Sequence, residues 1–291
     1  MARPKPIPKS IPKPKTNVCI VLDQSGSMSS FVKQVVDRLN FTLKILKDRS
    51  ATQDITFSLI KFSDNNKIYS APWCSPLISV SDFKYHDYIP AGNTALLDAT
   101  ERALVDMNII SGHDPEASFL VLVFTDGYEN NSVRANSEKI KKLIASLQKT
   151  DRWTITFEVP LGGGQVCEKL GIHPGNINEW EVSEEGFEHS TAHNTIAVTN
   201  YLSNRASGVR GMYTYHSMTT DLSNLEVQTV KTELDDVSNQ YKVCTVEKEI
   251  GIKTFVEAKT KKTIVKGNTF YQLTKTEKIQ TDKEVLIMEK G

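Results

Sequence analysis

The sequence predicts an α/β protein: an open, mostly parallel sheet with helices on both faces, followed by a small β-rich module. Two observations support this. Short, continuously apolar segments, typical of strands buried on both faces, alternate with segments whose apolar residues recur every three or four positions, as on a helix. This alternation covers about residues 17–206 and then stops. Strands that alternate with helices form parallel sheets whose two faces are covered by the helices.

The predicted strands are runs of apolar and β-branched residues. In chain order they cover residues 18–22, 55–62, 68–70, 119–124, 153–159 and 177–182. The run at 68–70 is short enough for an edge strand, whereas 18–22 and 119–124 are apolar throughout and should be buried strands covered on both faces of the sheet.

The predicted helices connect these strands. Their apolar residues share one face, and they cover about 32–46, 94–107, 140–147 and 184–205, with a short helix after the glycines at 162–164. Ser29 or Ser30 is placed to cap the first helix, because a serine hydroxyl can accept a hydrogen bond from a free N–H group at a helix start. Thr94 is placed to open the second.

The regions on either side of the predicted domain differ from it in composition. Residues 1–16 are rich in Lys and Pro and predict a tail without helix or interior strand. Residues 207–224 contain two glycines and many hydroxyl residues and predict a linker. Residues 225–291 are rich in Thr, Val, Ile, Tyr and Lys and predict the β-rich module.

Charge is unevenly distributed along a chain whose net charge is zero. Residues 1–15 carry five basic and no acidic residues, and residues 241–291 carry eleven lysines against seven acids, whereas the remaining residues 16–240 hold 19 basic against 28 acidic ones. The basic ends raise a nucleic-acid hypothesis, but the lysines at 259, 261, 262 and 266 accompany no recognition motif and are typical of a solvated face.

The location expected from the sequence is the cytoplasm, without membrane attachment. The longest purely apolar run, 119–124, is far shorter than the roughly 20 residues that cross a bilayer, and the N-terminus lacks the apolar stretch of a signal peptide. The four cysteines (Cys19, Cys74, Cys167 and Cys244) form no CxxC pair and are expected to be free thiols. The oligomeric state is left open.

Oxygen-bearing side chains lie in three of the predicted loops. Asp23, Ser25 and Ser27 come directly after the first strand, Thr94 follows a Gly-Asn turn, and Asp126 follows the strand at 119–124. Ligands of open α/β sheets bind at the carboxyl ends of the strands, and two carboxylates with three hydroxyls suit a hard cation such as Mg²⁺ or Mn²⁺. Because only two of these groups carry charge, a bound cation would stay electrophilic and could accept a carboxylate from elsewhere.

The three parts resemble the metal-ion-dependent adhesion site of von Willebrand factor A domains, which have a Rossmann-like sheet. These parts are DxSxS at 23–27, GxT at 92–94 and TDG at 125–127. The resemblance covers about residues 17–206. It implies that Ser25, Ser27 and Thr94 contact the metal directly, and that Asp23 and Asp126 do so directly or through water.

The resemblance also implies a function. Family membership implies binding of an Asp or Glu of a protein partner rather than catalysis, so the chain is predicted not to be an enzyme. Because the chain shows no export signal, the cytoplasmic bacterial and viral members, including those of tellurium-resistance operons, look closest. Met28, Asn93, Tyr128 and Glu129 lie next to the ligands in sequence and are candidate rim residues for specificity.

Other interpretations of these residues are weaker. An EF-hand would need Gly and Glu where Met28 and Gln34 stand. A metal-dependent hydrolase is the second hypothesis, with Glu129 as its only candidate base; an aspartyl phosphatase would need a carboxylate at Ser25. A structural or nucleic-acid-associated role is the third.

Other sequence features are more simply explained as structural. His189 and His193 could hold zinc with nearby glutamates, but they lack the HExxH order. The glycines at 162–164 lack the spacing of a phosphate-binding loop, and Cys167 with His173 lacks an orienting third group.

Overall fold

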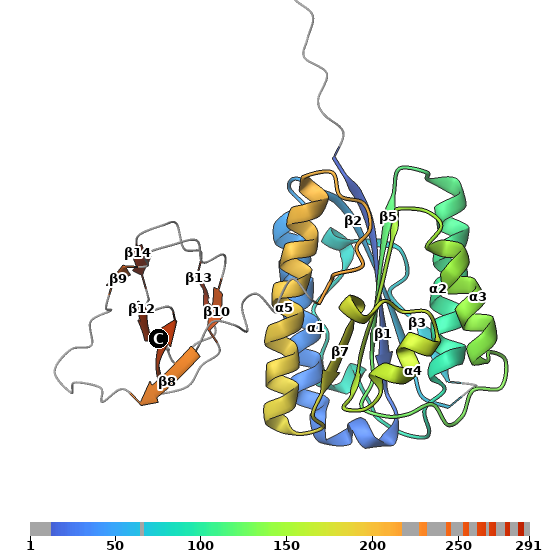
Figure 1. The fold of residues 1–291 in the computed structure, drawn as a ribbon, viewed down its shortest axis with the longest axis horizontal. Helices are drawn as coiled ribbons and strands as arrows, with labels where there is room; N and C mark the ends of the chain where they lie inside the picture. The colour runs from blue at the N-terminus through green and yellow to red at the C-terminus, as the bar shows by residue number, and fades with distance from the viewer. Residues whose placement is uncertain are drawn as a thin grey trace, which may run out of the picture. The chain divides into compact units, whose positions relative to one another are not determined.

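The computed structural model describes residues 13–64 and 67–216 and, beyond them, the backbone of strands β8 to β14. The chain divides into two compact units, Met1–Met218 and Thr219–Gly291. In the first unit a seven-stranded sheet lies between two layers of helices (Figure 1). The predicted fold class is therefore confirmed for this unit.

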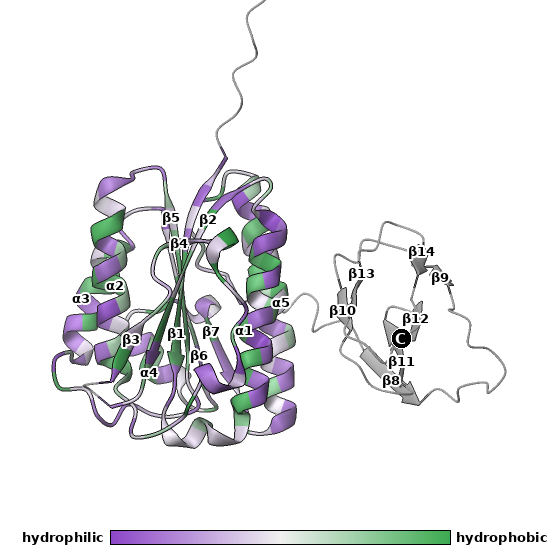
Figure 2. Ribbon diagram, turned by 180° about the vertical axis from the view of Figure 1, so that it is seen from behind, coloured by the Kyte–Doolittle hydropathy of each residue, from purple (hydrophilic) through white to green (hydrophobic). Residues whose placement is uncertain are grey.

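The sheet has the strand order β3-β2-β1-β5-β6-β7, with β4 also paired to β2. Its strands are β1 (Lys15–Asp23), β2 (Asp54–Phe62), β3 (Ile68–Ser70), β4 (Ser75–Pro76), β5 (Ser118–Phe124), β6 (Trp153–Pro160) and β7 (Ile177–Trp180). Neighbours are parallel except β3 and β4, which run antiparallel to β2. β1 is green, and so hydrophobic, along most of its length in Figure 2, as expected for a central strand covered on both faces.

Each face of the sheet has its own core. One face is covered by α1 (Val32–Arg49) and α5 (Glu184–Ala206), and the other by α2 (Leu96–His113), α3 (Ser137–Leu147) and α4 (Gly164–Lys169). Alternate residues of β1 contribute to the two cores: Val18, Ile20 and Leu22 to the first, Cys19 and Val21 to the second. No helix in the described part of the chain is long and apolar enough to cross a membrane.

The helix starts differ from those predicted. A 3₁₀ turn at Gly26–Phe31 occupies the predicted cap of α1, which begins at Val32 after Phe31; Ser29 instead donates to the carbonyl of Gly26. Packing decides this start, because the buried ring of Phe31 stacks on Phe187, at 5.4 Å between centroids, and draws the turn onto the core. α2 begins at Leu96 rather than at Thr94.

The first unit continues past the predicted boundary at 206. Met212 and Tyr215 are buried, and their backbone N–H groups donate to Thr154 Oγ1 at 2.8 Å and to Asn176 Oδ1 at 2.9 Å. The first half of the predicted linker thus packs on the sheet. The acceptors are buried polar groups of β6 and of the turn before β7. Because they are distant in the chain, the sequence around 212–215 does not reveal these hydrogen bonds.

The remaining predictions about the chain ends concern few described residues. β1 begins at Lys15, and the tail before residue 13 and the linker at 217–224 lie outside the described residues. In the second unit the described backbone consists of antiparallel strands: β8 (Val227–Lys231), β9 (Val243–Thr245), β10 (Lys253–Phe255), β11 (Lys261–Val265), β12 (Asn268–Tyr271), β13 (Glu277–Ile279) and β14 (Val285–Ile287).

Candidate metal site

The three loops that carry the predicted ligands are joined at the carboxyl edge of the sheet. The loop after β1 bonds the loop before α2 through Gly26 N to Gly92 O, at 3.0 Å, and Ala91 N to Gln24 O, at 2.9 Å. Because β5 lies beside β1 in parallel register, the third loop leaves the sheet at the same edge. The path of the backbone alone therefore brings the three loops together.

Four of the five predicted ligands are linked by hydrogen bonds, two of them between side chains and one to a backbone N–H group. Ser25 Oγ lies 3.1 Å from Ser27 Oγ, and Ser27 Oγ donates to Asp126 Oδ1 at 2.8 Å. Asp23 Oδ1 accepts from Ser25 N at 2.7 Å, and its Oδ2 accepts from Thr125 Oγ1 at 2.5 Å. Ser27 is exposed, while Asp23, Ser25 and Asp126 are buried, so the cluster opens to solvent on the Ser27 side.

Thr94 joins the same cluster beside Gly127. A Cβ placed on Gly127 would lie 3.4 Å from Thr94 Oγ1 and 4.0 Å from Ser27 Oγ. The hydroxyls of Thr94 and Ser27 therefore face the same small space, which the missing side chain of Gly127 leaves open. The structure thus brings together all five residues that the sequence singled out.

The donor set fits a hard divalent cation. Within the described part of the chain, the buried Oδ2 of Asp126 has no hydrogen-bond partner, although an uncompensated buried carboxylate oxygen is costly. Burial raises the pKa of Asp126, and burial together with the charge of Asp126 raises the pKa of Asp23 to about 6. A cation held by these residues would supply the missing positive charge, and the three hydroxyls would add neutral oxygen ligands.

Alternative metal sites receive no support. Among the described residues there is no group of three His, Cys, Asp or Glu side chains that could hold a metal ion. The candidate site differs from such a group because three of its five side chains are hydroxyls. His189 is exposed, and His193 stacks on His216 at 5.2 Å between ring centroids. The interpretation of these histidines as structural is therefore preferred.

Three further side chains hold the site in place, and two of them were not assigned a role from the sequence. Tyr88 Oη donates to the backbone oxygen of Asp23 at 2.5 Å, and Trp180 Nε1 donates to the backbone oxygen of Thr125 at 3.2 Å. The hydroxyl of Thr125 itself binds Asp23 and the backbone of Gly127. Of the three, only Thr125 lies within a motif, so only Thr125 could have been associated with the site from the sequence.

Of the predicted rim residues, Tyr128 lies at the surface, and its hydroxyl donates to the backbone oxygen of Leu161 at 3.3 Å. Tyr128 is 58% exposed. Met28 is fully buried in the core, so the prediction that it lines the rim is wrong: the 3₁₀ turn points it inward. Asn93 donates through its side chain and backbone to Asp64, and the Glu129 carboxylate accepts four hydrogen bonds.

The chain belongs to the von Willebrand factor type A domain family, because the profile of that family matches residues 17–166, about half of the sequence. This confirms the family that the three motif parts indicated. A search of proteins with curated descriptions gives no significant match.

Several solved structures are similar to the chain at low identity. Proximal thread matrix protein 1 from the mussel byssus, with a zinc-occupied MIDAS motif, is 13% identical with a TM-score of 0.43, covering 67% of this chain and 48% of that one. The pilus adhesin SpaC from Lactobacillus rhamnosus GG is 14% identical with a TM-score of 0.45, covering 94% of this chain and 38% of that one. Manganese-loaded TRAP protein from Plasmodium vivax is 14% identical with a TM-score of 0.42, covering 62% of this chain and 71% of that one. The chain thus spans about half the length of the mussel protein.

Proposed function

We propose that this chain is a metal-dependent protein-interaction module. Asp23, Ser25, Ser27, Thr94 and Asp126 would hold Mg²⁺ or Mn²⁺, and the cation would bind an Asp or Glu side chain of a protein partner. When bound, the cation supplies an electrophilic position for that carboxylate. The observation that carries the proposal is the buried, unpartnered Oδ2 of Asp126 within a cluster of hydroxyls that opens to solvent.

The hydrolase alternative lacks its base. Its only candidate, Glu129, has both carboxylate oxygens engaged by hydrogen-bond donors of the chain, at 2.6–2.9 Å. Donors of the chain thus occupy the oxygens that a general base would have to turn toward a water molecule. The geometry therefore favours binding over catalysis.

Titration calorimetry of the full chain with Mn²⁺ tests the metal site. The wild type should bind one Mn²⁺, and Asp126→Asn should abolish binding, since it removes one of the two charges. The variant keeps an oxygen for Ser27 and should fold as well as the wild type. Asp82→Asn, at an exposed carboxylate outside the site, should bind normally. Binding of Mn²⁺ by Asp126→Asn with wild-type affinity would refute the assignment.

A second experiment tests the partner. The immobilised full chain is incubated with extract of its own cells in Mg²⁺ and then eluted with EDTA. A protein partner should appear in the EDTA eluate of the wild type and not in that of Asp126→Asn. An identical eluate from both proteins would count against a metal-mediated contact.

Other features of the proposed partner and location rest on the sequence alone. The cytoplasmic location, the cytoplasmic bacterial or viral type, the choice between Mg²⁺ and Mn²⁺ and the domain limits at 16 and 224 stay predictions. The division of the chain at Met218 supports a separate C-terminal module. The basic segments behind the nucleic-acid hypothesis lie almost wholly outside the residues whose side chains are described.

A further inference from the structure

Helix α2 begins without a cap of its own. The residue before it is Ala95, whose side chain has no oxygen to accept from the free N–H groups of the first turn. Two of these groups instead donate to the loop that follows Asp126: Leu97 N to Glu129 Oε2 at 2.8 Å, and Asp98 N to Ser132 Oγ at 3.0 Å. The cap of this helix comes from a segment more than thirty positions further along the chain.

Glu129 is the centre of this contact. Its Oε1 accepts from the backbone N–H groups of Asn131, at 2.9 Å, and Ser132, at 2.6 Å, and its Oε2 accepts from Leu97 N and from Ser132 Oγ, at 2.7 Å. A negative charge at a helix N-terminus is also favoured by the helix dipole. The same carboxylate therefore shapes the loop after Asp126 and fastens it to α2.

The next residue binds the backbone of Thr94 directly. Thr94 N donates to Asn130 Oδ1 at 2.8 Å, and Thr94 O accepts from Asn130 N at 3.1 Å and from Asn131 N at 3.2 Å. Thr94 and Asp126 belong to different loops. The segment 129–132 follows Asp126 in the chain, and it also binds the backbone of Thr94.

We propose that Glu129 is a positioning residue of the metal site. It fixes the loop after Asp126 against the start of α2, so that Thr94 and Asp126 are already held at the same edge of the sheet before a cation arrives. This inference rests on the proposed function. A site whose ligands are already ordered binds more tightly, because less conformational entropy is lost on binding.

Asp98 offers a matched control. It is a buried carboxylate on α2, and it accepts backbone N–H groups from the same loop: Val133 at 3.0 Å, Arg134 at 2.9 Å and Ala135 at 2.7 Å. These three bonds hold residues 133–135, which follow Ser132, and none of them involves Thr94 or Asp126. Glu129→Gln and Asp98→Asn both replace a carboxylate by an amide of the same shape, so each variant loses acceptor capacity between the same helix and the same loop.

The test measures Mn²⁺ affinity of the full chain by calorimetry for wild type, Glu129→Ala, Glu129→Gln and Asp98→Asn. Residues that orient metal ligands typically change affinity by about 10–100-fold when replaced, and we expect a loss in this range for Glu129→Ala. Glu129→Gln keeps one acceptor oxygen for the loop N–H groups and should lose less. Asp98→Asn should lower the melting temperature and leave the Mn²⁺ affinity unchanged.

A metal-free measurement accompanies the titration. Amide hydrogen exchange of Leu97 should accelerate in the Glu129 variants and not in Asp98→Asn. Wild-type affinity in both Glu129 variants, or an equal loss of affinity in Asp98→Asn, would overturn the positioning role. Failure of the wild type to bind Mn²⁺ would overturn the proposed function and this inference together, so the two failures are distinguishable. If Glu129→Ala does not fold, Glu129→Gln alone decides by the same criteria.

Discussion

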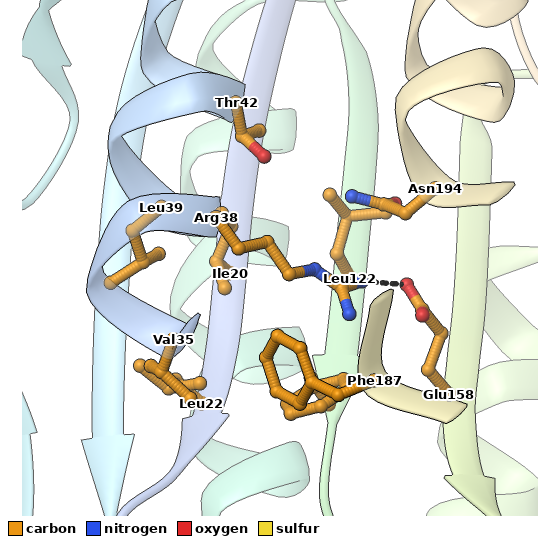
Figure 3. A pocket seen from close by; sticks show the side chains of 11 residues that line it. Ile20, Leu22, Val35, Arg38, Leu39, Thr42, Leu122, Glu158, Phe187 and Asn194 are labelled. Atoms are coloured by element: carbon orange, nitrogen blue, oxygen red, sulfur yellow. Dashed lines mark hydrogen bonds and ion pairs between the residues drawn. The ribbon is translucent and has the colours of Figure 1, made fainter. Parts of the chain in front are cut away.

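Replacing Arg38 by Met should destabilise the first unit by about 3–5 kcal/mol, because it leaves a buried carboxylate without its counter-charge. Nη2 of Arg38 lies 2.5 Å from Oε1 of Glu158, and the two side chains are only 11% and 4% exposed. Figure 3 shows Arg38 reaching from α1 toward Glu158 of β6. Both side chains line a small cavity of about 30 Å³. Such a space holds about one water molecule, too little to hydrate a charge.

The surroundings explain why Glu158 is charged in the first place. Burial alone would raise the pKa of Glu158, but the Arg38 charge and the hydrogen bond from Ser190 Oγ, at 2.6 Å, hold it below its usual range. The Arg38 guanidinium also lies over the ring of Phe124, 4.5 Å from its centroid. Without Arg38, burial dominates and the pKa of Glu158 rises. The loss of stability in Arg38→Met should therefore be larger at pH 7 than at pH 5, where the lone carboxyl can be protonated.

Urea denaturation of the wild type, Arg38→Met, Glu158→Gln and the double variant measures this coupling. Each single variant leaves one buried charge without its counter-charge, whereas the double variant leaves neither charge, so its loss should be well below the sum of the two. Effects that add within about 0.5 kcal/mol at pH 7 would refute the interaction. An equal deficit of Arg38→Met at pH 7 and pH 5 would refute the electrostatic reason for it.

Two further predictions concern pH and packing. Burial lowers the pKa of His216 to about 3, so between that value and about 6.5 this residue binds more protons in the unfolded chain. Its contribution to the free energy of unfolding should therefore fall on acidification by up to about 1.4 kcal/mol per pH unit. Urea denaturation at pH 7, 6 and 5 measures the slope, and a wild-type slope in His216→Gln would contradict this origin. Gly186→Ala should cost about 1–3 kcal/mol, because a Cβ there would lie 2.0 Å from the carbonyl oxygen of Glu181. Gly112→Ala, in α2 with no described atom within 4 Å of the added carbon, should instead stabilise by about 0.5–1 kcal/mol, and equal denaturation midpoints of the two variants would contradict the steric argument.

The order of the elements was predictable because burial on both faces leaves a simple record in the sequence. The strands at 18–22 and 119–124 are apolar throughout, and both lie in the middle of the sheet, paired with each other in parallel register. The five candidate ligands were predictable for a related reason. Parallel strands deliver their carboxyl ends to one edge, so the four ligands at the ends of β1 and β5 are close in space although they are far apart in the chain. Thr94 does not follow a parallel strand, and its signal was the GxT motif at 92–94.

The parts that the sequence did not reveal depend on contacts between distant segments. The predicted serine cap of α1 is absent because Phe31 packs on Trp180 and Phe187, which come some 150 positions later. The packing of Met212 and Tyr215 is similar, since their N–H groups depend on buried side chains of other elements. Local patterns describe which face of an element is apolar, and they carry no record of which distant side chain will satisfy a given polar group.

The composition of the candidate site makes such distant contacts important for function. Hydroxyl oxygens are neutral and weakly attracting ligands, so they add to the binding of a cation only if little entropy is lost in orienting them. The backbone around them is held from separate directions: Tyr88 donates to the oxygen of Asp23, Trp180 to the oxygen of Thr125, and Asn130 brackets Thr94. A cluster with more carboxylates would gain attraction but would leave the cation less able to accept an outside acid. The supporting side chains therefore allow a weakly charged site to be well ordered, and that combination is what a metal-mediated contact with an acidic partner requires.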